Sequence, residues 1–299
     1  MTKRRIQSRM FYSYLHDSSA VVGSVILVIS ILAALLAPWI TPQNPYDLEK
    51  VSLEYFLTPP IWMEGGHAPF IFGTDDQGRC IFSTIIYGCR TSLIVGFSVV
   101  LIAGTFGVIM GLLAGYYGGK LDAITMRLAD TFYSFSTTLL AFLFLGIFGK
   151  GSVSIVIIAI CIADWVKYGR TMRGSVLEVK QEAYIMAAKA TGAGDLRLLV
   201  RHLLPNAMPP IFVIIAVDLA VVIMLEATLS FLGVGVPLTE PSLGMMVAIG
   251  KNYIYAGMWW MIVFPGAALL LLVVGINLFA DWLREELNPK IERKAYDQP

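Results

Sequence analysis

Two acidic residues, Asp218 and Glu226, stand within an otherwise apolar stretch, 211–235. A charge in the hydrocarbon of a membrane is costly, so such residues usually face a bundle interior or a water-filled path. Eight positions apart on a helix, they differ by only about 80° around its axis. With Ser230 they are candidates for a polar patch that binds an amine on such a path. A helix–helix hydrogen bond, or a local one from Ser230 to Glu226, is an equally good interpretation.

The loop 73–79, Gly-Thr-Asp-Asp-Gln-Gly-Arg, is the second group with binding chemistry, because turns rich in glycine and aspartate present backbone N–H groups. Gly73, Asp75, Asp76 and Arg79 are therefore candidates for contact with an external partner. The interpretation that we favour is structural. It is a turn that leads into the next helix, with one of the two aspartates paired to Arg79 or to the later Arg90.

Other chemistries are not indicated. Asp164 lies three positions before Lys167, which favours a local ion pair. The three histidines and three cysteines are scattered and form neither a metal-ligand pattern nor a disulfide framework. A phosphate loop needs Gly, four residues and then Gly-Lys-Ser/Thr, and neither Gly119-Lys120 nor Gly149-Lys150 satisfies this. We expect no catalytic residue, no metal and no cofactor on this chain.

The composition is that of a polytopic membrane protein. The 299 residues are 57% hydrophobic and 14% charged, with a mean hydropathy of +0.72, whereas average soluble proteins carry about 25% charged residues. The first apolar run is too long for a signal peptide, so we expect an uncleaved span. The fourth is short and is expected to continue as a helix. The six apolar runs are about 21–40, 92–116, 132–148, 152–166, 211–235 and 259–282.

The basic residues predict the topology. Seventeen of the 22 Lys and Arg lie at the termini, in a short polar turn at 116–131 and in 167–206, which marks these parts as cytoplasmic. Six spans put both termini on that side. A further loop at 236–258 is expected to be re-entrant or at the surface. The predicted organisation is a cytoplasmic segment 1–17, a first transmembrane helix 18–40, a periplasmic excursion 41–88, a five-helix core 89–290 and a cytoplasmic tail 291–299.

The segment 167–206 is the longest polar gap between apolar runs and is expected to form two short helices with a hinge. Gly192 should end the first helix, Asp195 should cap the second, and Pro205 should stop it. The small side chains of Ala187, Ala188 and Gly192 would let another surface approach the backbone closely. This pattern predicts a docking element, and the alternative is an amphipathic helix on lipid headgroups.

The spacing of Ala187-Ala188, Gly192 and Leu204-Pro205 resembles the "EAA" loop of ATP-binding-cassette (ABC) importer permeases. Other motifs resemble the dipeptide/oligopeptide/nickel group, on its C-type subunit. These are Phe72-Gly-Thr-Asp-Asp-Gln-Gly-Arg79, Gly115-Tyr-Tyr-Gly-Gly119, Glu226-Ala-Thr-Leu-Ser-Phe-Leu-Gly-Val-Gly235, Asn277-Leu-Phe-Ala-Asp-Trp-Leu-Arg284 and Asn288-Pro289. The chain departs from the group's pattern at Cys80, Thr84, Ser136, Met186, His202 and Leu243.

The resemblance implies an all-α polytopic membrane protein with six transmembrane helices, both termini inside, the type I ABC importer permease fold, in the bacterial inner membrane. It implies a homologous B-type permease subunit, two ATPase subunits that use ATP and Mg, and an external substrate-binding protein, with no nucleic acid. This chain would be a transport subunit and not an enzyme. The residues expected to couple it to the ATPases are Ala187, Ala188, Gly192, Asp195 and Pro205.

The implied substrates are di- or oligopeptides, with nickel, opines or glutathione as alternatives. The lack of histidines and paired sulfur ligands in the spans favours a substrate other than metal. Two other classes remain open. An ion-coupled secondary transporter would use Asp218 and Glu226 as proton sites, although we find no internal repeat. A purely structural membrane protein would leave the docking segment without a purpose.

Overall fold

The computed structural model describes residues 14–46, 55–149, 152–237 and 239–287. Within these ranges the regular secondary structure is helical, residues 55–80 form turns and irregular backbone, and Thr74 and Cys80 make one isolated β-bridge. The helices are α2 (Ser18–Leu35), α3 (Ala37–Ile40), α4 (Ile81–Tyr117), α5 (Gly119–Tyr133), α6 (Thr137–Phe148), α7 (Val153–Val179), α8 (Ala183–Ala190), α9 (Asp195–Arg197), the π-helical turn η3 (Leu198–Leu203), α10 (Leu204–Ala207), α11 (Pro209–Phe231), α12 (Leu243–Tyr253), the 3₁₀ turn η4 (Ile254–Ala256) and α13 (Trp260–Glu286).

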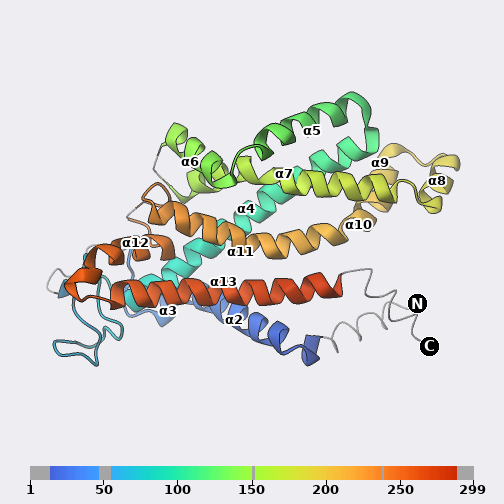
Figure 1. Ribbon diagram of the computed structural model, residues 1–299. Coiled ribbons are helices and arrows are strands. Elements are labelled where there is room, and N and C mark those ends of the chain that lie inside the picture. The colour runs from blue at the N-terminus through green and yellow to red at the C-terminus, as the bar shows by residue number, and fades with distance from the viewer. Residues whose placement is uncertain (1–13, 47–54, 150–151, 238, 288–299) are drawn as a thin grey trace.

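Four of the described helices, α2, α4, α11 and α13, are long and apolar enough to cross a membrane. The pair α5 and α6 adds a fifth if it is counted as one bent span. Figure 1 shows α7, α11 and α13 lying roughly side by side, with α4 crossing them obliquely. This architecture confirms the prediction of a mostly helical, multi-span chain.

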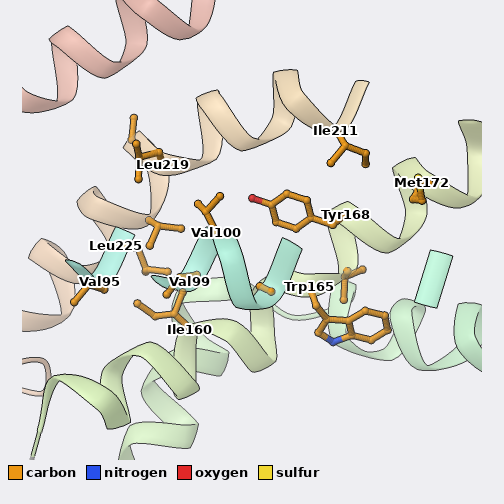
Figure 2. Packing of buried hydrophobic residues seen from close by; sticks show 14 of the residues in the cluster. Val95, Val99, Val100, Ile160, Trp165, Tyr168, Met172, Ile211, Leu219 and Leu225 are labelled. Atoms are coloured by element: carbon orange, nitrogen blue, oxygen red, sulfur yellow. The ribbon is translucent and has the colours of Figure 1, made fainter. Parts of the chain in front are cut away.

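The core lies where α4, α7 and α11 meet. Val99 and Val100 of α4, Ile160 of α7 and Leu225 of α11 converge there (Figure 2). Glycines at positions 104, 107, 111 and 115 let α4 and α7 cross closely. Small residues three or four positions apart predict a close helix crossing, and a methyl group at Gly107 would indeed lie 2.4 Å from a backbone oxygen of α7.

Helix α4 is longer than the sequence predicts. Its 37 residues extend about 55 Å, and it begins at Ile81 rather than near position 92. The first turns mix polar and apolar residues, which lowers the hydropathy, yet ten of the eleven residues at 81–91 are buried or partly buried. Tertiary packing therefore extends the helix beyond its apolar run.

Two predictions about the third apolar run are wrong. The expected polar turn at 116–131 is the helix α5, and the expected continuous span 132–148 is broken between α5 and α6, which meet at 90°. The ion pairs of Asp122 with Arg173 and of Asp130 with Arg170 hold α5 against α7. Because these partners are 40 or more positions apart, the local pattern does not reveal them.

The segment 236–258 is also more ordered than a loop. It contains α12, whose first turn is capped by Ser242, because its hydroxyl accepts a 3.1 Å hydrogen bond from the backbone N–H of Met245. Gly244 packs directly against the backbone of Ala227 in α11. Helix α2 packs on α13 in the same way, with Gly23 and Gly275 facing each other.

The first and last long helices of the described chain have their outer ends on the same side as α8 (Figure 1). The first turn of α2, the last turn of α13 and α8 lie at one end of the molecule, and α3 and α12 lie at the opposite end (Figure 1). Most of the predicted segment 1–17, the tail 291–299 and the motif Asn288-Pro289 lie outside the described residues, as does part of the predicted excursion 41–88.

Candidate functional site

The segment from α8 to α10 projects from one end of the bundle. Gly192 has a φ of +83°, which ends α8 as predicted. Ala187 is exposed, Ala188 is partly buried, and no atom would lie within 4 Å of a methyl group at Gly192. The backbone at this turn is therefore open to another surface.

Apolar side chains face solvent on both sides of this turn. Tyr184 and Met186 of α8, Leu196 of α9 and Val200 of η3 are each more than one-third exposed, and Leu196 is 75% exposed. Exposed large apolar side chains that gather on one element are typical of a protein–protein contact. Other side chains anchor the segment by their burial in the core, and these are Ile185, Leu198, Leu199 and Leu203.

Asp195 does not cap the second helix, so that prediction is wrong. The N-cap position belongs to Gly194, and the carboxylate of Asp195 instead accepts a 2.6 Å hydrogen bond from the hydroxyl of Tyr116. Lys180 donates a 2.5 Å hydrogen bond to the backbone carbonyl of Tyr116. Tyr116 lies in the motif Gly115-Tyr-Tyr-Gly-Gly119, and spacing along the sequence gave no sign of its contact with Asp195, 79 positions away.

Pro205 does not stop the helical segment, which is a second correction. It lies in the first turn of α10, where proline is tolerated because that N–H has no intrahelical partner. The chain continues through Met208 into α11, which itself starts with Pro209. The residues predicted to couple thus lie along a chain of short helices that leads directly into a membrane-spanning helix.

Asp218 belongs to a buried cluster between α11 and α7. It contacts the ammonium group of Lys167 and accepts a 2.5 Å hydrogen bond from the hydroxyl of Tyr168. The same ammonium lies 2.6 Å from Asp164, so the predicted local ion pair is confirmed. Sequence reasoning missed that Lys167 joins both aspartates, because Asp218 is 51 positions away.

Glu226 joins α11 to α4. Its two carboxylate oxygens accept hydrogen bonds from Ser230 at 2.8 Å and from Ser92 at 2.9 Å, and the residue is fully buried. These are the local and interhelical bonds of the structural interpretation. Asp218 and Glu226 have separate partners and do not form one patch. Asp218 borders a hollow of about 380 Å³, and its place on a path stays a prediction.

The loop 73–79 is stabilised by an ion pair between two of its own residues. Arg79 pairs with Asp75 at 2.7 Å, both residues are at least 95% buried, and a methyl group at Gly73 would collide with the backbone of Thr58. This confirms the structural interpretation of the loop. Asp76 is less buried and lies 3.5 Å from the hydroxyl of Tyr253. Burial and the neighbouring Asp75 carboxylate raise the pKa of Asp76 above its ordinary value.

Comparison with known proteins adds a family assignment. Residues 107–293 match the family described as binding-protein-dependent transport system inner membrane component, and residues 8–60 match the N-terminal TM domain of oligopeptide transport permease C. A di/tripeptide transport system permease protein, DppC, of Pseudomonas aeruginosa is 38% identical over 283 residues, which cover 95% of this chain and 92% of that protein.

Two further relatives agree. The dipeptide transport system permease protein DppC of Haemophilus influenzae is 36% identical over 291 residues, 97% of each chain. A solved structure of the MetNI methionine ABC transporter, in an inward-facing conformation, has a TM-score of 0.56 at 19% identity, and covers 70% of this chain and 98% of that chain. At this identity the likeness shows the fold alone.

Proposed function

Since this chain belongs to the family of binding-protein-dependent transport system inner membrane components, within the peptide permeases of ABC importers, we propose that it forms half of the translocation path for di- or oligopeptides. The substrate class follows from the names of its near-full-length relatives. In this proposal the chain lines the path of the peptide and transmits the movement of the ATPase subunits to the membrane helices. ATP and Mg are used by the partner ATPase subunits.

The proposed topology has six spans with both termini in the cytoplasm of a bacterium, across its inner membrane. Helices α2, α4, α11 and α13 are four of the spans, and α7, whose 27 residues extend about 40 Å, is another. The bent pair α5–α6 is the remaining one, since the twelve residues of α6 extend only about 18 Å and a bilayer core is about 30 Å thick. The concentration of basic residues around α8 supports its cytoplasmic location.

The observation that carries the proposal is the exposed segment from α8 to α10. Its backbone is open at Gly192, its apolar side chains face outward, and its end passes directly into α11. An ATPase subunit that grips Ala187, Ala188 and Gly192 would move Asp195 and Pro205 with them. The motion then reaches α11 through the chain and α4 through Tyr116.

The proposed partners are a homologous B-type permease subunit, two ATPase subunits and an external substrate-binding protein. The opposite end of the molecule, with α12 and the loop 73–79, would meet the binding protein. Because Gly73, Asp75 and Arg79 are interior to that loop, they shape this surface, and Asp76 is the member of the set that is left partly accessible.

The test is purification of the tagged chain in mild detergent with identification of what accompanies it, followed by reconstitution. We expect ATPase subunits and a second permease, and ATP-dependent uptake of a labelled dipeptide when the binding protein is present. Unlabelled dipeptide should compete with the label, whereas glutathione, opines and nickel should not. A chain that purifies alone and drives uptake from an ion gradient would contradict the proposal.

A further inference from the structure

Asp164, Lys167 and Asp218 form a charge triad between α7 and α11. The ammonium nitrogen of Lys167 lies 2.6 Å from Oδ1 of Asp164 and also contacts Oδ1 of Asp218. The hydroxyl of Tyr168 donates to the other oxygen of Asp218. Asp164 is 5% exposed and Asp218 is 3% exposed, so both carboxylates are held away from solvent.

The charges of the triad do not balance. Two acidic side chains face one ammonium group inside an apolar bundle, so the triad has one more acidic group than basic groups. Oδ2 of Asp164 is buried and has no hydrogen-bond partner among the described residues. A buried carboxylate oxygen without a donor is unfavourable, and such groups call for a specific explanation. An additional cationic donor at this oxygen would satisfy both the charge and the hydrogen bond.

Glu226, which lies in α11 like Asp218, is a buried carboxylate whose hydrogen bonds are complete. Both of its oxygens accept a hydrogen bond from a serine, and the residue is completely buried. Asp164 differs from Glu226 because its Oδ2 accepts no hydrogen bond from the described residues. The triad also differs from Glu226 because its residues line hollows at the edge of the core.

Access to the triad comes through hollows beside it. Lys167, whose side chain is 32% exposed, lies in the walls of three hollows of about 380, 460 and 250 Å³. Asp164 and Thr137 both line the hollows of about 460 and 250 Å³, and Asp218 and Arg284 both line the hollow of about 380 Å³. Each carboxylate therefore lies beside a hollow whose wall also includes Lys167.

We propose that the triad is a transient binding site for the α-ammonium group of a peptide in transit, an inference that rests on the proposed function. The ammonium group donates to Oδ2 of Asp164 and shares the negative charge with Asp218. Lys167 carries its charge on a flexible four-carbon stem, so its ammonium can swing into a hollow as the peptide's enters. In the hollow the ammonium of Lys167 pairs with the C-terminal carboxylate of the peptide. The triad therefore binds both charged ends of a short peptide.

The first experiment uses the complete importer in proteoliposomes with its binding protein. Asp164→Asn keeps the shape of the side chain and removes its charge. We expect the uptake rate of a free dipeptide to fall about tenfold, while ATP hydrolysis stimulated by the loaded binding protein stays within twofold of wild type. Asp164→Glu should recover much of the uptake. The matched control is Asp130→Asn, which removes an exposed carboxylate that is paired to α7 outside the triad and should leave uptake unchanged.

A second measurement reports binding without relying on turnover. In a complex freed of native cysteines, Thr137→Cys places a thiol in the wall of two hollows. During transport, a free dipeptide should slow labelling by a cationic thiol reagent at least threefold, and Asp164→Asn should remove this protection. Normal uptake in Asp164→Asn, equal labelling with and without peptide, or a parallel loss of uptake and stimulated ATP hydrolysis would each overturn the site. A wild-type importer without peptide uptake would contradict the proposed function itself, so the two failures are distinct.

Discussion

The hydroxyl of Tyr116 donates a 2.6 Å hydrogen bond to the carboxylate of Asp195 and so ties the last turn of α4 to the start of α9. The backbone carbonyl of the same tyrosine accepts a hydrogen bond from Lys180, just before α8. One residue of a membrane-spanning helix thus holds the proposed ATPase-docking segment at two points. Through these hydrogen bonds α4 contacts the docking segment directly, although the two are not consecutive in the sequence.

Tyr116→Phe should separate ATP hydrolysis from transport. The change removes one hydrogen bond, worth about 1 kcal/mol, so folding should be little affected. We expect a several-fold lower ratio of peptide imported to ATP hydrolysed in the reconstituted complex. Tyr117→Phe alters the exposed neighbour and is the matched control. An unchanged ratio in the Tyr116 variant would show that the contact does not transmit motion.

Gly192→Asp should abolish uptake without preventing membrane insertion. A side chain at a φ of +83° strains the backbone by roughly 1–2 kcal/mol and projects a charge from the open docking turn. The control is Gly194→Asp, which is also exposed but has a φ of −67°. Membrane fractionation measures insertion and labelled-dipeptide uptake measures coupling. Wild-type uptake in the Gly192 variant would refute the role of this turn.

Gly107→Ala should destabilise the protein by about 1–3 kcal/mol, because its methyl group would lie 2.4 Å from the carbonyl oxygen of Trp165 and 2.6 Å from Cβ of Tyr168. Gly146→Ala is the matched control, since it lies in α6 with no neighbouring atom within 4 Å and should be neutral or stabilising by up to about 1 kcal/mol. Thermal unfolding in detergent compares the two. Equal melting temperatures would contradict close packing of α4 on α7.

Asp76 should make the external loop more stable in acid. Burial and the charge of Asp75 raise the pKa of Asp76 in the folded protein, so the folded state binds this proton more tightly than the unfolded chain. The contribution to stability is complete below the ordinary aspartate pKa and is lost as the pH rises through the raised value. Asp76→Asn should remove this dependence. Melting temperatures of both proteins between pH 3 and 7 provide the test, and parallel curves would exclude the effect.

Local features of the sequence were good guides where the interaction partners are close along the chain. The break at Gly192, the pairing of Asp75 with Arg79 and that of Asp164 with Lys167 all lie within one or two turns. Glycine spacing also predicted a close helix crossing, because small residues on one face have that consequence whatever the partner is.

Contacts between distant segments were not predictable. Asp195 has the residue type of a helix cap, but a tyrosine 79 positions away binds it instead. Asp122 and Asp130 read as parts of a polar turn because their partners, Arg173 and Arg170, stand on another helix. Spacing rules describe neighbours on one element, whereas these pairs depend on how α5 and α7 pack.

The length of α4 has a mechanical consequence. This uninterrupted helix runs about 55 Å, from the docking segment at Tyr116 to Cys80, whose backbone N–H is held by Gln43 at the opposite end. If it pivots where it crosses α7 and α11, a tilt of about 5° displaces its two ends by roughly 2–3 Å in opposite directions. Such a tilt narrows one end of the translocation path as it widens the other. A single rigid helix would therefore suffice to keep the two ends from being open at the same time.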